Sequence, residues 1–94
     1  MTASFPIRHD PTAGQFVARL PDGGGVLRYT AAGDGVIELY HVEVDPVLRG
    51  HGVAGALVAA ACEHARSAGL KVIPSCPYVE WWFGRHPECG ELVR

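Results

Sequence analysis

The fold of this chain is decided by Val44-Asp45-Pro46-Val47-Leu48-Arg49-Gly50-His51-Gly52-Val53-Ala54. This stretch contains the end of an apolar strand, a proline turn, a basic glycine loop and the start of a helix. Its glycines let the backbone adopt unusual angles and allow a ligand to approach the main chain. The first N–H groups of the helix lack intrahelical partners and carry partial positive charge. We therefore expect a phosphate or pyrophosphate site here, with an ordinary strand–helix turn as the alternative.

Two common phosphate-binding motifs do not match this loop. It lacks the Gly-Lys-Ser/Thr ending of a nucleoside-triphosphate loop. It also lacks the third glycine of a dinucleotide-binding turn, because Ala54 follows too soon. In addition, the preceding strands are expected to be antiparallel, which does not fit the βαβ unit of that turn.

The chain before the loop is predicted to form an antiparallel meander. Three apolar stretches of strand length are separated by short turns rich in glycine, a pattern typical of consecutive hairpins. The predicted strands are Gln15–Leu20, Val26–Ala31 and Val36–Val44, and a further short strand is expected near Phe5–Arg8. The turn between the first two of the three is expected at Pro21–Gly25.

After Gly52 the apolar period changes from two to 3.6, which predicts a helix that ends at Gly69. Its apolar stripe consists of Val53, Ala54, Leu57, Val58, Ala61, Cys62 and Ala65. The next stretch, Leu70–Pro74, is expected to return to the sheet parallel to the third strand. Tyr78–Phe83 is expected to form a second short helix, closed by Gly84 and His86-Pro87.

Length and composition indicate one domain, residues 1–94, with a modest core. The chain is 48% hydrophobic and 19% charged, as in globular proteins. Its net charge of −2 gives no general attraction to nucleic acid, and no apolar run approaches the roughly 20 residues of a membrane span. The N-terminal residues do not resemble a secretory signal, so the three cysteines predict reduced thiols in a cytoplasm.

The loop Arg49–Ala54 resembles the Arg/Gln-x-x-Gly-x-Gly/Ala pyrophosphate loop of the GCN5-related N-acetyltransferases. The preceding Val42–Pro46, the segment Ser75–Tyr78 and the ending His86–Glu88 look like the small single-domain members of that family. The resemblance extends from Phe16 to Glu88. It implies an α+β fold (an α/β-type sandwich) with an antiparallel meander, a glycine loop, a central helix, a parallel strand and a short C-terminal helix.

The resemblance also implies that the chain binds acetyl-coenzyme A (acetyl-CoA). The diphosphate would lie on the main chain of Arg49, Gly50, His51, Gly52, Val53 and Ala54. The pantetheine arm would follow the third strand of the meander and use main-chain groups near Val42 and Val44. The implied activity is N-acetyl transfer to an unidentified amine, with a protein or peptide as one kind of acceptor.

Four residues are candidates for catalysis. His41 and Glu43 share one face of a strand and are expected to hold and deprotonate an amine, or only to satisfy each other by a hydrogen bond. Cys76 is either an acyl-accepting nucleophile or a small buried side chain. Tyr78 would donate a proton to the leaving thiolate or pack over the cofactor.

The sequence departs from larger members of the family at two points. Trp81 and Trp82 stand where those members carry a tyrosine that protonates the thiolate. The chain also lacks the two helices that enclose the amine, so the acceptor is expected to be large or to dock through its own surface. Three consecutive aromatic residues cannot all be buried by one helix face, so at least one of Trp81, Trp82 and Phe83 should be exposed.

The remaining cysteines and histidines do not suggest a metal site, because His86 and Cys89 lack a second pair of ligands. Cys62 is expected in the core, and Cys89 is expected to be inert or surface-exposed. Two other functions stay open: a non-catalytic acyl-CoA-binding or sensor module, and a loop that binds another nucleotide. We expect a monomer or weak homodimer that binds neither nucleic acid nor membrane.

Overall fold

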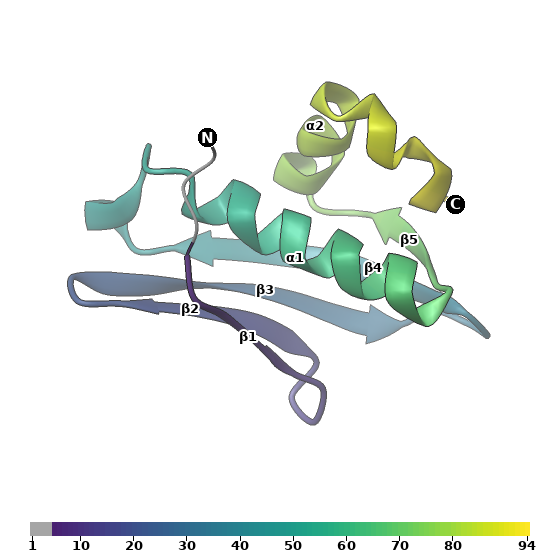
Figure 1. Ribbon diagram of the computed structural model, residues 1–94, viewed down its shortest axis with the longest axis horizontal. Helices are drawn as coiled ribbons and strands as arrows, with labels where there is room; N and C mark the ends of the chain where they lie inside the picture. The colour runs from purple at the N-terminus through teal and green to yellow at the C-terminus, as the bar shows by residue number, and fades with distance from the viewer. Residues whose placement is uncertain (1–4) are drawn as a thin grey trace.

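The computed structural model describes residues 5–94, which form a sheet with helices packed on one of its faces (Figure 1). The strands and the two α-helices are β1 (Ile7–Asp10), β2 (Gln15–Leu20), β3 (Gly23–Ala31), β4 (Val36–Val44), α1 (Val53–Ala68), β5 (Lys71–Pro74) and α2 (Pro77–Arg85). Two short 3-10 helices, Pro46–Leu48 and Pro87–Leu92, follow β4 and α2. The predicted order of strands and helices is therefore confirmed.

The five strands pair in the order in which they occur in the chain, β1-β2-β3-β4-β5. The first three pairs are antiparallel, and β5 pairs parallel to β4 after the α1 crossover. Both the meander and the parallel return strand were predicted from the sequence. The pairing of β5 covers only Val36–Leu39, so the second half of β4 has no neighbour on that side among residues 5–94.

A β-bulge in β4 determines which side chains face the helices. Arg28 pairs with His41 but Tyr29 pairs with Leu39, so Tyr40 is the extra residue. On the two sides of the bulge, Leu39 and Val42 both belong to the face that packs against α1. His41 and Glu43 consequently lie on the opposite face, which we call the outer face.

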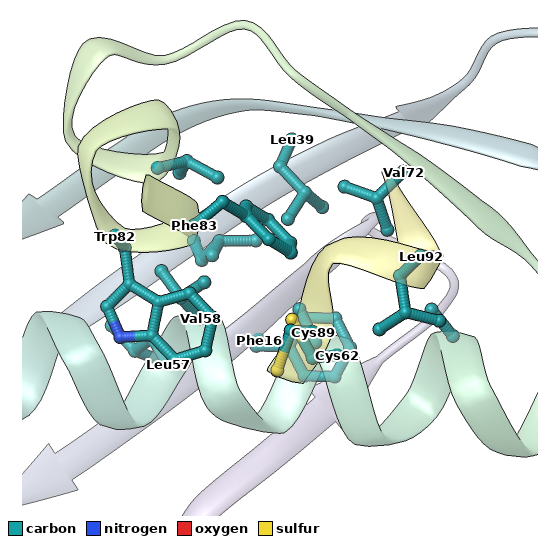
Figure 2. Packing of buried hydrophobic residues seen from close by; sticks show 14 of the residues in the cluster. Phe16, Leu39, Leu57, Val58, Cys62, Val72, Trp82, Phe83, Cys89 and Leu92 are labelled. Carbon is teal, nitrogen blue, oxygen red and sulfur yellow. The ribbon is translucent and has the colours of Figure 1, made fainter. Parts of the chain in front are cut away.

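The core lies between α1, α2 and the inner face of the sheet (Figure 2). The predicted apolar stripe of α1 supplies six of its buried residues: Val53, Leu57, Val58, Ala61, Cys62 and Ala65. Gly69 ends α1 in a left-handed conformation, as expected, and its N–H donates to the last turn. From α2, Trp82 and Phe83 are buried while Trp81 is 54% exposed, so the prediction that one of the three aromatics stays exposed is confirmed.

The structure corrects the expected boundaries of several elements. β3 begins at Gly23, because Gly23–Gly25 pair with β2 and only Pro21 and Asp22 remain in the turn. A side chain at Gly25 would press on Leu57 of α1, so this glycine serves packing within a strand. The strand expected near Phe5–Arg8 lies at Ile7–Asp10. The second helix begins at Pro77 and ends at Arg85, immediately before the His86-Pro87 pair that was expected to close it.

Cys89 was predicted to be inert or surface-exposed, and the prediction of surface exposure is wrong. Cys89 is 8% exposed and joins the core from the segment Pro87–Leu92, beside Cys62 (Figure 2). Burial, together with the neighbouring Cys89, raises the pKa of the Cys62 thiol to about 12. Cys62 is in the core, as expected, and its thiol stays protonated at neutral pH.

A cluster of histidine and aromatic side chains joins β1 to α1. The ring of His9 stacks on Phe16 at 4.3 Å between centroids, and His64 meets its edge at 4.3 Å. His9 Nε2 and the Tyr29 hydroxyl share a hydrogen bond of 2.6 Å. Burial lowers the pKa of His9 from 6.5, the charge of His64 lowers it further, and Asp10 opposes the shift. Protonation of His9 therefore costs more in the folded protein than in the unfolded chain.

This cluster predicts a loss of stability in mild acid. Because the folded-state pKa of His9 is depressed, the unfolded chain binds the proton more readily, and the free energy of unfolding falls as the pH drops through about 6.5 and below. Urea unfolding at pH 7.5 and at pH 5.0 measures this effect. His9→Phe should reduce the difference between the two conditions, whereas His51→Gln, in an exposed loop, should leave it unchanged. Equal pH dependence in wild type and His9→Phe would contradict the assignment.

Candidate functional site

The glycine loop holds its main chain open toward solvent. Gly50 and Gly52 adopt positive φ values of 82° and 86°, a conformation that favours glycine. A Cβ atom would meet nothing within 4 Å at Gly50 and only Phe5 at 4.0 Å at Gly52, so space does not explain these residues. The backbone angles explain them instead. Two amides of the loop are used within it, because the Arg49 N–H donates to the Pro46 carbonyl at 3.2 Å and the His51 N–H donates to the Leu48 carbonyl at 3.3 Å.

The loop leads into α1 with free N–H donors. The first helical hydrogen bond runs from the Ala56 N–H to the Gly52 carbonyl, at 3.0 Å. The N–H groups of Val53, Ala54 and Gly55 therefore precede the helical ladder. No side chain caps this end of α1 within residues 5–94, and the first turn carries no acidic residue. The arrangement, with Arg49 alongside, is suited to an anion.

The second half of β4 presents free main-chain groups to the same region. The Asp45 N–H donates to the Gly24 carbonyl of β3, at 2.9 Å. In an antiparallel strand the N–H and C=O groups of successive residues point alternately to the two neighbouring sides. Because the Asp45 N–H points toward β3, the N–H and C=O groups of Val42 and Val44 point away from it. On that side β4 continues past the last residue of β5, and the Cys76 N–H closes the junction by donating to the Leu39 carbonyl at 3.2 Å. The part of β4 that continues past β5 is an open edge (Figure 1). Val42 and Val44 lie on this part of the strand.

Three hollows adjoin one another through shared lining residues, and together we call them the loop groove. The first, of about 280 Å³, lies at the open edge between Val42, Glu43 and Tyr78. The second, of about 370 Å³, lies over the glycine loop and the start of α1. The third, of about 520 Å³, lies between α1 and α2 and reaches Phe5 and Ile7. Tyr78 lines all three hollows, which makes it the central side chain of the groove.

His41 and Glu43 form the pair that the strand periodicity predicted. Their Nε2 and Oε1 atoms lie 3.2 Å apart, and the side chains are 46% and 69% exposed. Glu43 also borders the open-edge hollow with Val42 and Val44. This carboxylate therefore stands at the junction of the loop groove and the outer face, where a base could act on a group that arrives from solvent.

Tyr78 and Cys76 lie at the start of α2 but in different surroundings. Burial raises the pKa of Tyr78, so its phenol stays protonated at neutral pH and is available as a hydrogen-bond donor to the groove. Cys76 is half-buried, immediately precedes α2 and packs against the core. It does not line any of the three hollows that make up the loop groove. A nucleophilic role for Cys76 remains a prediction.

The structure adds groove residues that sequence reasoning missed. Gly55 of α1 faces α2, because a Cβ atom there would be 3.5 Å from both the Tyr78 hydroxyl and the Trp82 ring. The exposed Trp81 lines two of the hollows, and Arg85 lies over its ring at 5.4 Å. Conversely, His51 is exposed and does not line the groove over the loop. The sequence signal for Gly55 was its small size at the third position of the predicted helix.

Residues 5–94 contain neither a group of side chains suited to a metal ion nor a helix suited to span a membrane. Among residues 5–94, no three His, Cys, Asp or Glu side chains are grouped so that they could hold a metal ion. None of the helices between these residues has the length and apolar character needed to cross a membrane.

Comparison with known protein sequences gives one family and several relatives. Residues 15–92 match the sequence model of a family described as GCN5-related N-acetyl-transferase. The chain is 34% identical over 86 residues to human Protein NATD1, an alignment that covers 87% of this chain and 76% of that protein. It is 31% identical over 88 residues to Protein NATD1 of Xenopus tropicalis, with 92% and 81% covered.

The fold is shared with a GCN5-like protein from Staphylococcus aureus whose solution structure was determined by NMR. The two structures superimpose with a TM-score of 0.76 at 22% sequence identity, and the match covers 99% of this chain and 91% of the other.

Proposed function

This chain belongs to the GCN5-related N-acetyltransferase family, and from that premise we propose that it binds acetyl-CoA in the loop groove and transfers the acetyl group to an amine. The observation that carries the proposal is the coincidence of three features in the loop groove. These are the free N–H groups of Val53–Gly55, the open edge of β4 and the hollow that joins them.

The residues of the groove fit the chemistry of acetyl-CoA. Its diphosphate suits the amides that follow Gly52, where the helix dipole and Arg49 favour negative charge. Its pantetheine arm carries amide groups, which suit the unpaired main-chain groups of Val42 and Val44. Its adenine suits the aromatic wall formed by Trp81. Placed in this way, acetyl-CoA would extend along the whole loop groove, and its acetyl end would lie toward Glu43.

Acetyl-CoA supplies an activated acetyl group as a thioester. Around it, Glu43 would accept a proton from the attacking amine, directly or through His41, which lies 3.2 Å from it. The amine nitrogen bonds to the acetyl carbon, the carbon–sulfur bond breaks, and the sulfur takes one proton. Tyr78 is placed to supply that proton because it lines every part of the groove. The pKa of Tyr78 is raised by burial, so the transfer would depend on the thiolate being close to its hydroxyl. Solvent then returns a proton to the phenolate.

Calorimetric titration with acetyl-CoA and, separately, with coenzyme A tests the proposal directly. We expect micromolar dissociation constants, about −8 kcal/mol, for both ligands. Competition with ATP distinguishes the alternative of a general nucleotide site, since ATP should not displace acetyl-CoA. If neither coenzyme A nor acetyl-CoA binds, the proposal is wrong and the glycine loop is an ordinary turn.

Cys76→Ala separates direct transfer from a covalent route. If Cys76 accepts the acetyl group, the wild type should gain one acetyl mass on incubation with acetyl-CoA, and the variant should not. Turnover of the variant should then fall more than its cofactor affinity, because the thiol acts in the transfer step. Cys62→Ala is the matched control, since Cys62 is buried and its thiol protonated. Unchanged turnover in Cys76→Ala would assign Cys76 to packing alone.

A non-catalytic acyl-CoA-binding module is the second candidate. The exposure of His41 and Glu43 favours it, because an enclosed base is usually more effective in proton transfer. Binding of acetyl-CoA without acetyl transfer to any protein or peptide amine would support this module. The enzyme reading predicts instead that Glu43→Gln abolishes transfer and leaves acetyl-CoA affinity unchanged.

A further inference from the structure

The outer face of the sheet is bare, because α1, α2 and the C-terminal segment pack on the inner face (Figure 1). Within residues 5–94, no element covers the outer side of β1 to β4. Its centre is apolar, since Val17 and Val26 are direct neighbours on β2 and β3 and both remain partly exposed. Antiparallel sheets commonly leave one face to solvent, so the two valines alone do not indicate a partner, and the charged residues around them carry the argument.

Arginines surround this apolar centre. Arg8, Arg19 and Arg28 are exposed, alternate with inner-face residues along their strands, and make no ion pair within residues 5–94. Arg8 and Arg19 line one hollow of about 240 Å³ over Val17. Arg28 lies on β3 directly opposite His41. One side of the outer face is therefore basic and contains a recess that suits a carboxylate side chain.

The other side of the same face holds the candidate base. Cross-strand pairing places Arg8, Val17, Val26 and Glu43 in one row across four strands. With neighbouring strands about 4.8 Å apart, the backbone positions at the ends of the row lie roughly 14 Å apart. Glu43 borders the loop groove, so the row leads from the arginine recess to the proposed position of the acetyl group.

We propose that the outer face docks an acidic protein segment that carries the acceptor amine. The inference rests on the proposed function, because it places the acetyl group beside Glu43. Acidic side chains of the segment pair with Arg8 and Arg19, its apolar residues cover Val17 and Val26, and its lysine reaches Glu43. An extended chain advances about 3.3 Å per residue, so the acidic residues stand about four positions from the lysine.

Charge distribution favours a protein segment over nucleic acid. The chain as a whole is negative, at −2, and Glu38 and Glu43 share the outer face with the arginines. These carboxylates would repel a continuous phosphate backbone along the row. A segment with separate acidic and basic side chains matches both signs.

Two labelled peptides test the proposal. Both carry a single lysine, with either Glu-Glu or Arg-Arg three and four positions before it. Binding is measured by fluorescence anisotropy in saturating coenzyme A, and acetylation by mass spectrometry with acetyl-CoA. We expect the Glu-Glu peptide to bind and to be acetylated about tenfold better, with the advantage reduced at high salt.

Variants identify the surface. The double variant Arg8→Gln/Arg19→Gln should bind the Glu-Glu peptide about tenfold more weakly, since two charged pairs are lost. Arg94→Gln, an exposed arginine near the C-terminus, is the matched control and should bind as wild type does. Coenzyme A affinity, measured by calorimetry, should be equal in all three proteins, because Arg8 and Arg19 lie outside the loop groove.

Several results would overturn the inference. Equal binding of the two peptides, or full binding by the double variant, would exclude the arginine surface. Selective binding without acetylation of either lysine would exclude its role as the acceptor site. Tighter, arginine-dependent binding of a dodecathymidine oligonucleotide would assign the face to nucleic acid instead. If the wild-type protein does not bind coenzyme A, the proposed function itself is wrong, and the docking surface that rests on it falls with it.

Discussion

Gly52→Val is expected to weaken acetyl-CoA binding by about 100-fold, which corresponds to two lost hydrogen bonds to a charged group at about 1.5 kcal/mol each. Gly52 precedes α1 with φ at 86°, and a β-branched residue is strained there. Because no atom lies closer than 4.0 Å to the added Cβ, the loss arises from backbone rotation. That rotation turns the following amides out of the anion site. Calorimetric titration with acetyl-CoA measures the effect.

Gly69→Val provides a matched control at the opposite end of α1. Gly69 also has a positive φ, of 70°, and its added Cβ would meet nothing within 4 Å. Both variants should lose about 1–3 kcal/mol of folding stability from the strained backbone. Only Gly52→Val should lose acetyl-CoA affinity. Wild-type affinity in a folded Gly52→Val protein would place the ligand elsewhere, and equal losses in both variants would indicate a general effect on the helix.

The largest expected effect on stability belongs to Leu57→Ala. Leu57 is fully buried on α1 and packs against the glycine-rich part of β3, where it leaves no room for a side chain at Gly25. Removal of its outer carbon atoms should lower the free energy of unfolding by about 2–5 kcal/mol, through lost burial and the cavity left behind. This is a large fraction of the roughly 5–15 kcal/mol that stabilises a domain. Urea unfolding at pH 7.5 measures it.

Val47→Ala is the control for the loss of apolar atoms at the surface. Val47 is 61% exposed in the turn after β4, so the substitution should change the free energy of unfolding by no more than about 0.5 kcal/mol. A Leu57→Ala protein as stable as Val47→Ala would contradict the packing of α1 on β3. The intermediate case, with a loss near 2 kcal/mol, would mean that neighbouring side chains collapse into the cavity.

The proposed function and the docking surface divide the sheet between two tasks. In these proposals the edge of β4, the glycine loop, α1 and α2 form the loop groove for acetyl-CoA, and the outer face receives the acceptor. Glu43 is the residue that both regions share. A small chain can present an acceptor surface of this kind because it has no further helices over the outer face within residues 5–94.

The sequence alone determined the local features of this protein. Alternation and 3.6-residue periodicity depend on neighbouring residues, so the meander, the stripe of α1 and its end at Gly69 were all predictable. The glycine loop was recognisable for the same reason, since Gly50 and Gly52 need a backbone conformation that glycine adopts readily. The pairing of His41 with Glu43 also followed from the strand period.

Only the tertiary structure decided the features that depend on distant residues. Gly23–Gly25 looked like a turn, but pairing with β2 and the approach of Leu57 place them in a strand. Cys89 looked exposed, but the segment after α2 folds back onto α1 and buries it. The bulge at Tyr40 and the early end of β5 open the edge beside Val42. Each of these features depends on the free energy of packing between segments that are far apart in the chain. Local sequence patterns reflect only neighbouring residues, so they do not predict it.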